Sequence, residues 1–187
     1  VPVGMIVALP PATSPVSVTV SNALVALKAG NAVLFAPHPR AKQTIGKALD
    51  YLIEAAEAAG LPEGALAYLH TVTLAGTREL LNHKGTALII NTAVPDLLEY
   101  CYSSGKPVIY GGYGHGPAFI ERTADLTQAV ADIMLSKTFD FGMGAAAEQA
   151  VVVDGPVADM VRREFERRGA HFLSHEETMQ LGHRLFP

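Results

Sequence analysis

The stretch APHPRAK carries three basic side chains at alternate positions, His38, Arg40 and Lys42. It overlaps the end of an apolar run, Asn31–Pro37, that has the composition of a buried strand. In doubly wound folds the turn after the second strand receives the adenosine half of a dinucleotide, where these side chains would meet ribose or phosphate. The alternative is a turn made rigid by proline, with charges that only face water. We favour nucleotide contact and assign Pro37, His38, Arg40 and Lys42 to it.

The stretch GGYGHG, from Gly111 to Gly116, could cradle a phosphate with its backbone N–H groups. It lacks the G-x-G-x-x-G order, however, and it follows the fifth apolar run rather than the first. A hinge between two domains close to the cofactor is the better interpretation, with Gly112 and Gly114 supplying positive φ angles. His115 lies at the centre of this stretch, but a single loop histidine is usually only solvated.

The stretch SKTFDFGMGAAAEQAVVVDG, from Ser136 to Gly155, combines a loop punctuated by glycine with small residues and an apolar strand. Such a loop is typical of a segment that presents a reactive side chain. It nevertheless presents three alanines, Ala145 to Ala147. The sequence thus shapes a loop around side chains that have no reactive group.

Cys101 is the single cysteine of the chain, so it permits neither an internal disulfide nor a metal site built from several cysteines. It lies beside aromatic residues on an expected helix, where a buried and inert thiol is the commoner state. A reducing cytoplasm is the simplest compartment for such a protein. We expect no metal site.

The composition argues against two classes of partner. The formal net charge is -4, and the basic residues are scattered, so no surface is expected that would neutralise the phosphates of a nucleic acid. No uninterrupted apolar segment approaches the length of ~18 residues that a membrane span needs. No basic stretch precedes an apolar one at the start of the chain, so a signal peptide is not expected either.

Apolar runs alternate with helical patterns along the first part of the chain. The helical patterns Val16–Ala29 and Arg40–Ala59 both stop at glycine, a residue favoured just after a helix. In runs such as TALII every residue after the threonine is apolar, as burial on both faces of a sheet requires. The order predicts an α/β fold, a doubly wound parallel sheet covered by helices on both sides. Its expected strands are Gly4–Pro10, Asn31–Pro37, Ala65–His70, Thr86–Asn91 and Pro107–Tyr110.

The remainder of the chain predicts a second α/β unit with the order α-β-α-β-α. The charged run RREFERR within it is interpreted as the solvated face of a helix. The boundary before this second domain is expected near Tyr110 to Pro117. The expected elements of that domain are Asp125–Lys137, Ala150–Asp154, Val157–Arg168, Ala170–Leu173 and Glu176–Leu185.

Seven segments in order resemble one family, the CoA-acylating branch of the NAD-dependent aldehyde dehydrogenases. They are PVGMIVALPPATSP, NALVALKAGNAVLFAPHPRAK, AAGLPEG, YSSGKPVI, SKTFDFGM, AAEQAVVVD and FERRGAHFLS. The resemblance covers nearly the whole chain. It implies a Rossmann-like dinucleotide-binding region, residues 1–107, followed by the first part of a catalytic domain, residues 108–187. Because the family is normally more than twice this long, the chain is expected to be a central fragment.

The resemblance also implies which positions carry the chemistry. The family's nucleophilic cysteine falls at Ala145, and its oxyanion-binding asparagine falls at Ser14, whose hydroxyl is shorter and freer to rotate. The glycine pair after the fourth strand is Ala93-Val94 here. Added side chains there would crowd a backbone that lies against the nicotinamide.

Three further positions follow from the same resemblance. His115-Gly116 stands for the family's Asn-Thr pair, Phe141 stands where asparagine is usual, and Glu148 matches a glutamate just after the nucleophile. Departures gather at chemical positions, which favours a relative that kept the fold and lost or changed the reaction. A methyl group cannot attack a carbonyl, so the chain as written is expected to be inert.

The implied activity is NAD-dependent oxidation of a small aldehyde to its acyl-CoA, with NAD or NADP as cofactor, CoA as co-substrate and a homo-oligomer as the assembly. One alternative is a non-catalytic protein that keeps the sheet to bind a nucleotide or to act as a scaffold. Another is an unrelated flavodoxin-like or receiver-type domain, which fits the alternation of strands and helices but not the seven ordered segments.

Overall fold

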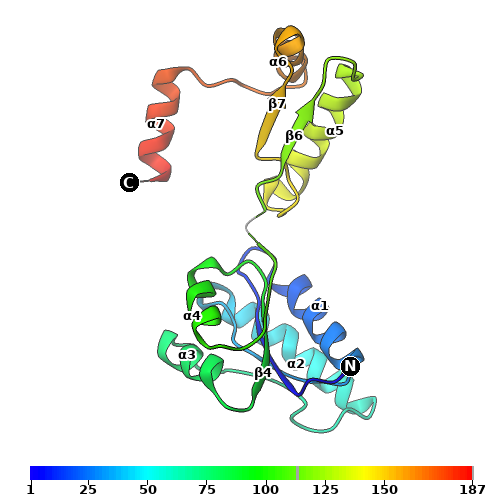
Figure 1. Ribbon diagram of the computed structural model, residues 1–187, viewed down its shortest axis with the longest axis vertical. Coiled ribbons are helices and arrows are strands. Elements are labelled where there is room, and N and C mark those ends of the chain that lie inside the picture. Colours follow the sequence, from blue (N-terminus) through cyan, green and yellow to red (C-terminus); the bar gives the residue numbers. More distant parts are fainter. Residues whose placement is uncertain (113, 187) are drawn as a thin grey trace. The chain divides into compact units, whose positions relative to one another are not determined.

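A computed structural model describes residues 1–112 and 114–186. The chain forms two compact units, Val1–Tyr113 and Gly114–Pro187, and each is described by itself (Figure 1). In the described part of the chain no helix has both the length and the apolar character that crossing a membrane requires.

The first unit is built on a five-stranded sheet with the order β3-β2-β1-β4-β5, and all its strand pairs are parallel. The order reverses between β1 and β4, which makes the gap at their carboxyl ends the place where doubly wound proteins bind ligands. The predicted α/β doubly wound fold is confirmed. The strands are β1 (Met5–Leu9), β2 (Ala32–Phe35), β3 (Leu66–Tyr68), β4 (Thr86–Asn91) and β5 (Val108–Tyr110).

Helices cover both faces of this sheet (Figure 1). Alternate residues of β1 point to opposite faces, so Ile6 joins the core under α1 and α2, while Val7 joins the core under α3 and α4. Each core is fully buried at its centre, at Phe35 on one face and at Ile89 on the other. The helices are α1 (Pro15–Lys28), α2 (Lys42–Ala58), α3 (Leu74–Asn82) and α4 (Leu98–Ser103), with short 3₁₀ turns η1 (Pro39–Ala41) and η2 (Pro95–Leu97).

The second unit contains a β-α-β crossover in which β6 and β7 pair in parallel. Helix α5 connects the two strands and packs beside α6 over a core centred on Val130 and Val161 (Figure 1). The elements are β6 (Pro117–Ile120), α5 (Leu126–Thr138), η3 (Phe139–Gly142), β7 (Ala150–Val153), η4 (Gly155–Val157), α6 (Ala158–Arg167) and α7 (His175–Leu185).

Two details differ from the sequence-based prediction of this unit. The strand β6 was missed because it has only four residues and begins with a proline. A strand tolerates proline at its first position. The predicted strand Ala170–Leu173 is wrong: these residues form no strand. Ala170 instead donates its N–H to the carbonyl of Phe165, which completes the end of α6.

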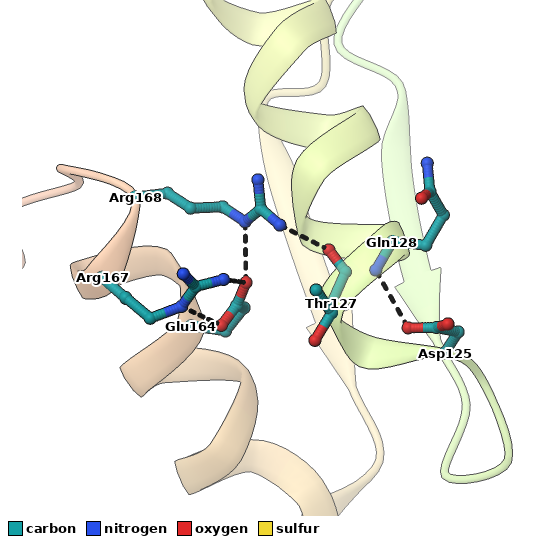
Figure 2. A network of polar contacts seen from close by, with 6 residues as sticks. All are labelled: Asp125, Thr127, Gln128, Glu164, Arg167 and Arg168. Carbon is teal, nitrogen blue, oxygen red and sulfur yellow. Dashed lines mark hydrogen bonds and ion pairs between the residues drawn. The ribbon is translucent and has the colours of Figure 1, made fainter.

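A polar network ties α6 to α5 (Figure 2). The carboxylate of Glu164 accepts from both Nε and Nη2 of Arg167, at 2.7 and 2.6 Å, and from Nε of Arg168 at 2.7 Å. Arg168 then donates from Nη2 to the carbonyl of Thr127 in the first turn of α5, at 3.1 Å. The network therefore holds the end of one helix against the start of the other.

Candidate functional site

The carboxyl ends of β1, β2 and β4 surround a cavity of about 410 Å³ in the first unit. Its volume lies in the range of small-ligand sites, roughly 300–1,000 Å³. The wall combines apolar side chains with His38, Arg40, Asp96 and the first turn of α3. The lining residues are Leu9, Pro10, Ala36, Pro37, His38, Pro39, Arg40, Val72, Thr73, Leu74, Thr77, Val94, Asp96 and Leu97.

The turn after β2 places its basic residues unequally around this cavity. Pro37 is buried, and the ring of His38 is fixed because its Nδ1 accepts from the backbone N–H of Arg40 at 3.2 Å. Arg40 lines the cavity and is otherwise exposed. Lys42 begins α2 and lies outside the cavity wall. Three of the four residues predicted here thus gather at one cavity, and Lys42 does not.

The loop after β4 supplies another part of the wall. Val94 is buried and lines the cavity, whereas Ala93 does not. Ala93 has a φ of 54°, a left-handed conformation that a residue with a Cβ adopts at a cost of about 1–2 kcal/mol. The backbone here therefore keeps the shape that glycine would take most easily.

Asn91, the last residue of β4, was missed by the sequence-based prediction. Its side chain is fully buried and is hydrogen-bonded to both the N–H and the carbonyl of Val94. The signal in the sequence is the polar residue that closes the otherwise apolar run TALIIN, because a buried polar side chain needs partners.

Ser14 and Gly112 lie outside the cavity wall as well. Ser14 is the residue before α1, half-buried, and its hydroxyl makes no capping hydrogen bond to the helix. Its hydroxyl is thus not used by the first turn of α1. Gly112 has a φ of 74°, in agreement with the positive φ expected of this segment.

The loop around position 145 belongs to the second unit. Ala145 is exposed, and nothing lies within 4 Å of the Cβ position of the preceding Gly144. Gly114 has a φ of 80° and comes so close that a Cβ on it would lie 2.3 Å from the carbonyl oxygen of Ala145. Gly114 and Ala145 are therefore neighbours, as two parts of one site would be.

Glu148 sits three residues further along this loop and is half-buried. A hydrogen bond from Ser136, with a smaller effect from the charge of Lys137, holds the pKa of the Glu148 carboxyl below its ordinary value. The ammonium of Lys137 donates to Oε1 of Gln149 at 2.8 Å. Glu148 is therefore an ionised acceptor rather than a proton donor at neutral pH.

Cys101 is fully buried, and its burial raises the pKa of the thiol. A protonated thiol without access to solvent is a poor nucleophile. This agrees with the interpretation of Cys101 as an inert core residue.

One H-x-x-x-H spacing does occur in the sequence, at His171 and His175, and it bears on the expectation that there is no metal site. His171 lies before α7 and its Nε2 is 3.2 Å from Oε1 of Glu177, whereas His175 is the first residue of the helix. The two rings are thus not placed on one helical face. Among residues 1–112 and 114–186, no group of three or more His, Cys, Asp or Glu side chains is arranged to hold a metal.

A parallel sheet with this strand order and a cavity at its carboxyl ends defines a protein of the doubly wound, Rossmann-like class. Residues 1–180 match the aldehyde dehydrogenase family, and the chain belongs to that family. It matches the acylating branch of the family, as its relatives show.

The bifunctional aldehyde-alcohol dehydrogenase of Escherichia coli K12 is 40% identical over 176 residues, which are 94% of this chain and 20% of the relative. A probable aldehyde dehydrogenase from Listeria monocytogenes EGD-e superposes with a TM-score of 0.92 and 45% identity, covering 97% of this chain and 40% of that one. An acetylating aldehyde dehydrogenase from Geobacillus thermoglucosidasius gives a TM-score of 0.92 and 40% identity, covering 100% of this chain and 41% of that one. The chain therefore spans about a fifth to two fifths of the length of these relatives.

Proposed function

We propose that this chain forms the dinucleotide-binding region and the first part of the catalytic domain of an NAD-dependent, CoA-acylating aldehyde dehydrogenase in which Ala145 stands at the position of the nucleophile. Residues 1–107 are proposed to bind the nucleotide and residues 108–187 to begin the catalytic domain. The whole protein is proposed to belong to the enzymes that convert a small aldehyde, CoA and NAD to acyl-CoA and NADH. The observation that carries the proposal is the match of residues 1–180 to the aldehyde dehydrogenase family, together with the exposed Ala145 on the loop that Gly114 approaches.

The residues of the cavity fit the adenosine half of a dinucleotide. Leu9, Pro37 and Val94 offer apolar surface for a base, and His38 and Arg40 offer donors for ribose and phosphate. NAD, when bound, supplies the acceptor for a hydride. An engineered glycolyl-CoA reductase that is 28% identical to this chain has bound NADP⁺, which supports a nucleotide role for this region.

The acylating step supports CoA as the second substrate. A propionaldehyde dehydrogenase from Rhodopseudomonas palustris, 28% identical to this chain, has bound CoA and an acylated cysteine. Covalent capture of an acyl group requires a thiolate, and the methyl group of Ala145 supplies none. Removing a covalent nucleophile typically costs several orders of magnitude in rate, so this chain is proposed to be inactive as written.

Other parts of the site are proposed to keep their roles. The hydroxyl of Ser14, which makes no capping bond, is free to donate to an oxyanion. Glu148 orients the loop, since with Ala145 beside it there is no thiol to deprotonate. The whole protein is proposed to be a cytoplasmic homo-oligomer that takes a small aldehyde.

A second candidate function is a non-catalytic nucleotide-binding or scaffolding protein. The left-handed backbone at Ala93 and at His115, with φ values of 54° and 63°, favours it. Both are positions where the resemblance expects glycine or asparagine, so the shape is retained while the residue types are not. Calorimetric titration with NAD, CoA and ADP separates a nucleotide-binding protein from a scaffold, because a scaffold binds none of them.

The substitution Ala145→Cys in the whole protein tests the first candidate. We expect a burst of NADH with acetaldehyde or propionaldehyde when CoA and NAD are present. The matched control is Ala146→Cys, which adds an equally exposed thiol one residue away. NAD binding without any NADH from the Ala145→Cys protein contradicts a mere loss of the nucleophile and favours the second candidate.

A further inference from the structure

The side chain of Asn91, the last residue of β4, is hydrogen-bonded to the loop that follows the strand. Its Oδ1 accepts from the N–H of Val94 at 2.9 Å, and its Nδ2 donates to the carbonyl of Val94 at 2.9 Å. The same Nδ2 lies 3.6 Å from Sγ of Cys101. The buried amide of Asn91 is thus hydrogen-bonded to both the N–H and the carbonyl of Val94, three positions further along the chain.

These two hydrogen bonds between Asn91 and Val94, called the clamp below, close a loop that contains a strained residue. Ala93, between the two ends of the clamp, has a φ of 54°. In the left-handed region the Cβ of an alanine crowds the following carbonyl oxygen. An alanine therefore stays there only where other contacts hold its backbone. The hydrogen bonds of Asn91 hold Ala93 in that conformation.

The loop is also fixed from its other side. The N–H of Thr92 donates to the carbonyl of Leu9 at 3.2 Å, and Asn22 of α1 donates to the hydroxyl of Thr92 at 3.3 Å. The clamp therefore joins a loop that is already anchored to β1 and α1. Its remaining freedom lies at Ala93 and Val94, which are the residues that Asn91 restrains.

Val94 is the point at which this clamp reaches the cavity. It is 7% exposed, it lines the cavity beside Leu9 and Leu97, and it is the residue before η2. If Val94 moved, this part of the cavity wall would move with it. We propose that Asn91 is a positioning residue for the nucleotide site, which it shapes through its side-chain amide by holding the loop 92–94 with Ala93 in a left-handed conformation.

This inference rests on the proposed nucleotide-binding function of the cavity. Asn91 does not touch the cavity itself, since it is absent from the cavity wall and fully buried. Its effect on binding is thus indirect. A buried asparagine can also serve stability alone, so the test needs a second asparagine that does only that.

Asn31 provides the matched control. It is also buried, and it also clamps a backbone turn: its Oδ1 accepts from the N–H groups of Val3 and Gly4, and its Nδ2 donates to the carbonyl of Ala26. It precedes β2, so it lies at the amino ends of the strands, away from the cavity at their carboxyl ends. Its replacement removes comparable hydrogen bonds without reaching the cavity wall.

The experiment compares Asn91→Ala and Asn31→Ala in the whole protein by calorimetric titration with ADP and NAD, well below both melting temperatures. We expect both substitutions to lower the melting temperature, and only Asn91→Ala to weaken nucleotide binding, by about tenfold or more. The double substitution Asn91→Ala with Ala93→Gly should recover part of the lost affinity, because glycine adopts a positive φ without a clamp. Asn91→Asp replaces Asn91→Ala if the latter does not fold. Its carboxylate still accepts from Val94 but does not donate to it, so weaker binding is again expected.

The outcomes separate two failures. If the unsubstituted protein binds none of ADP, NAD and CoA, the proposed nucleotide function is wrong, and this inference is overturned as well. If that protein binds ADP or NAD, but Asn91→Ala or Asn91→Asp matches Asn31→Ala within about twofold, Asn91 is a structural residue only and the inference is overturned. Loss of affinity without any recovery on adding Ala93→Gly contradicts the role assigned to the left-handed turn.

Discussion

Gly114 and Ala145 meet backbone to backbone. A Cβ placed on Gly114 would lie 2.3 Å from the carbonyl oxygen of Ala145 and 3.1 Å from its Cα, and Gly114 has a φ of 80°. Contact this close requires glycine, which also adopts a left-handed backbone at no steric cost. The segment predicted as a glycine hinge therefore passes directly beside the loop at the proposed reactive position.

The substitution Gly114→Ala should consequently disturb this loop. We expect it to lower the free energy of unfolding by about 1–3 kcal/mol, because neither the Cβ nor the positive φ is tolerated without a shift of the backbone. Urea denaturation of the whole protein measures the change.

Gly116→Ala is the control for Gly114→Ala. An added Cβ at Gly116 meets nothing within 4 Å, and its φ is not in the left-handed region. Equal losses for the two substitutions would show that the close approach to Ala145 does not matter.

Glu164 gives the protein a pH-dependent connection between α5 and α6. The hydrogen bonds from Arg167 and Arg168 lower the pKa of its carboxyl from the ordinary 4.5 to about 2 (Figure 2). A lowered pKa in the folded state contributes stability above the unfolded pKa, and this contribution is lost as the pH falls from about 4.5 toward 2. Because both arginines are partly exposed, the effect should weaken in high salt.

The test compares unfolding of the parent protein with that of Glu164→Gln between pH 6 and pH 2. We expect Glu164→Gln to be less stable at pH 6 and the difference to shrink as the pH falls. Glu166→Gln serves as the comparison, since Glu166 has one exposed partner, Arg162, at 3.4 Å. A difference that stays constant down to pH 2 would rule out the titration of Glu164 as its cause.

The thiol of Cys101 should react slowly in the folded protein. Burial keeps it from solvent and raises its pKa, so little thiolate forms at neutral pH. We expect an alkylating reagent to modify Cys101 only after urea is added. The Ala145→Cys protein, with a second thiol at an exposed position, should take up one equivalent rapidly without urea. Rapid uptake of reagent by the unsubstituted folded protein would contradict the buried placement of Cys101.

The buried strands of the sheet are well predicted from the sequence, because burial determines where apolar residues stand. Runs such as ALII, apolar at every position, identify strands with helices on both faces, and the sheet of the first unit follows from them. The strand β5, predicted at Pro107–Tyr110, belongs to that sheet. The short strand β6 was missed because four residues beginning with proline carry too little periodicity.

Backbone conformation at the loops could not be predicted in this way. Ala93 and Phe141 are left-handed, yet neither residue type favours a positive φ. Tertiary contacts such as the clamp of Asn91 on Val94 impose the conformation of Ala93, and side-chain preference does not. At both positions the resemblance expects a glycine or an asparagine, so the fold has retained backbone shapes that the present side chains oppose.

The strain of a left-handed backbone can be measured most clearly at Phe141. It has a φ of 54° and its side chain is 98% exposed, so it bears the strain of a left-handed backbone without burying apolar surface in return. Asparagine tolerates this conformation because its short side chain can bond locally. We therefore expect Phe141→Asn to raise the free energy of unfolding by about 0.5–1 kcal/mol, measured by urea denaturation. Phe139→Asn is the matched control, since Phe139 is 75% exposed but has an ordinary φ of -59°, so its replacement relieves no strain. An equal gain from both substitutions would trace the effect to lost exposed apolar surface and not to the backbone at Phe141.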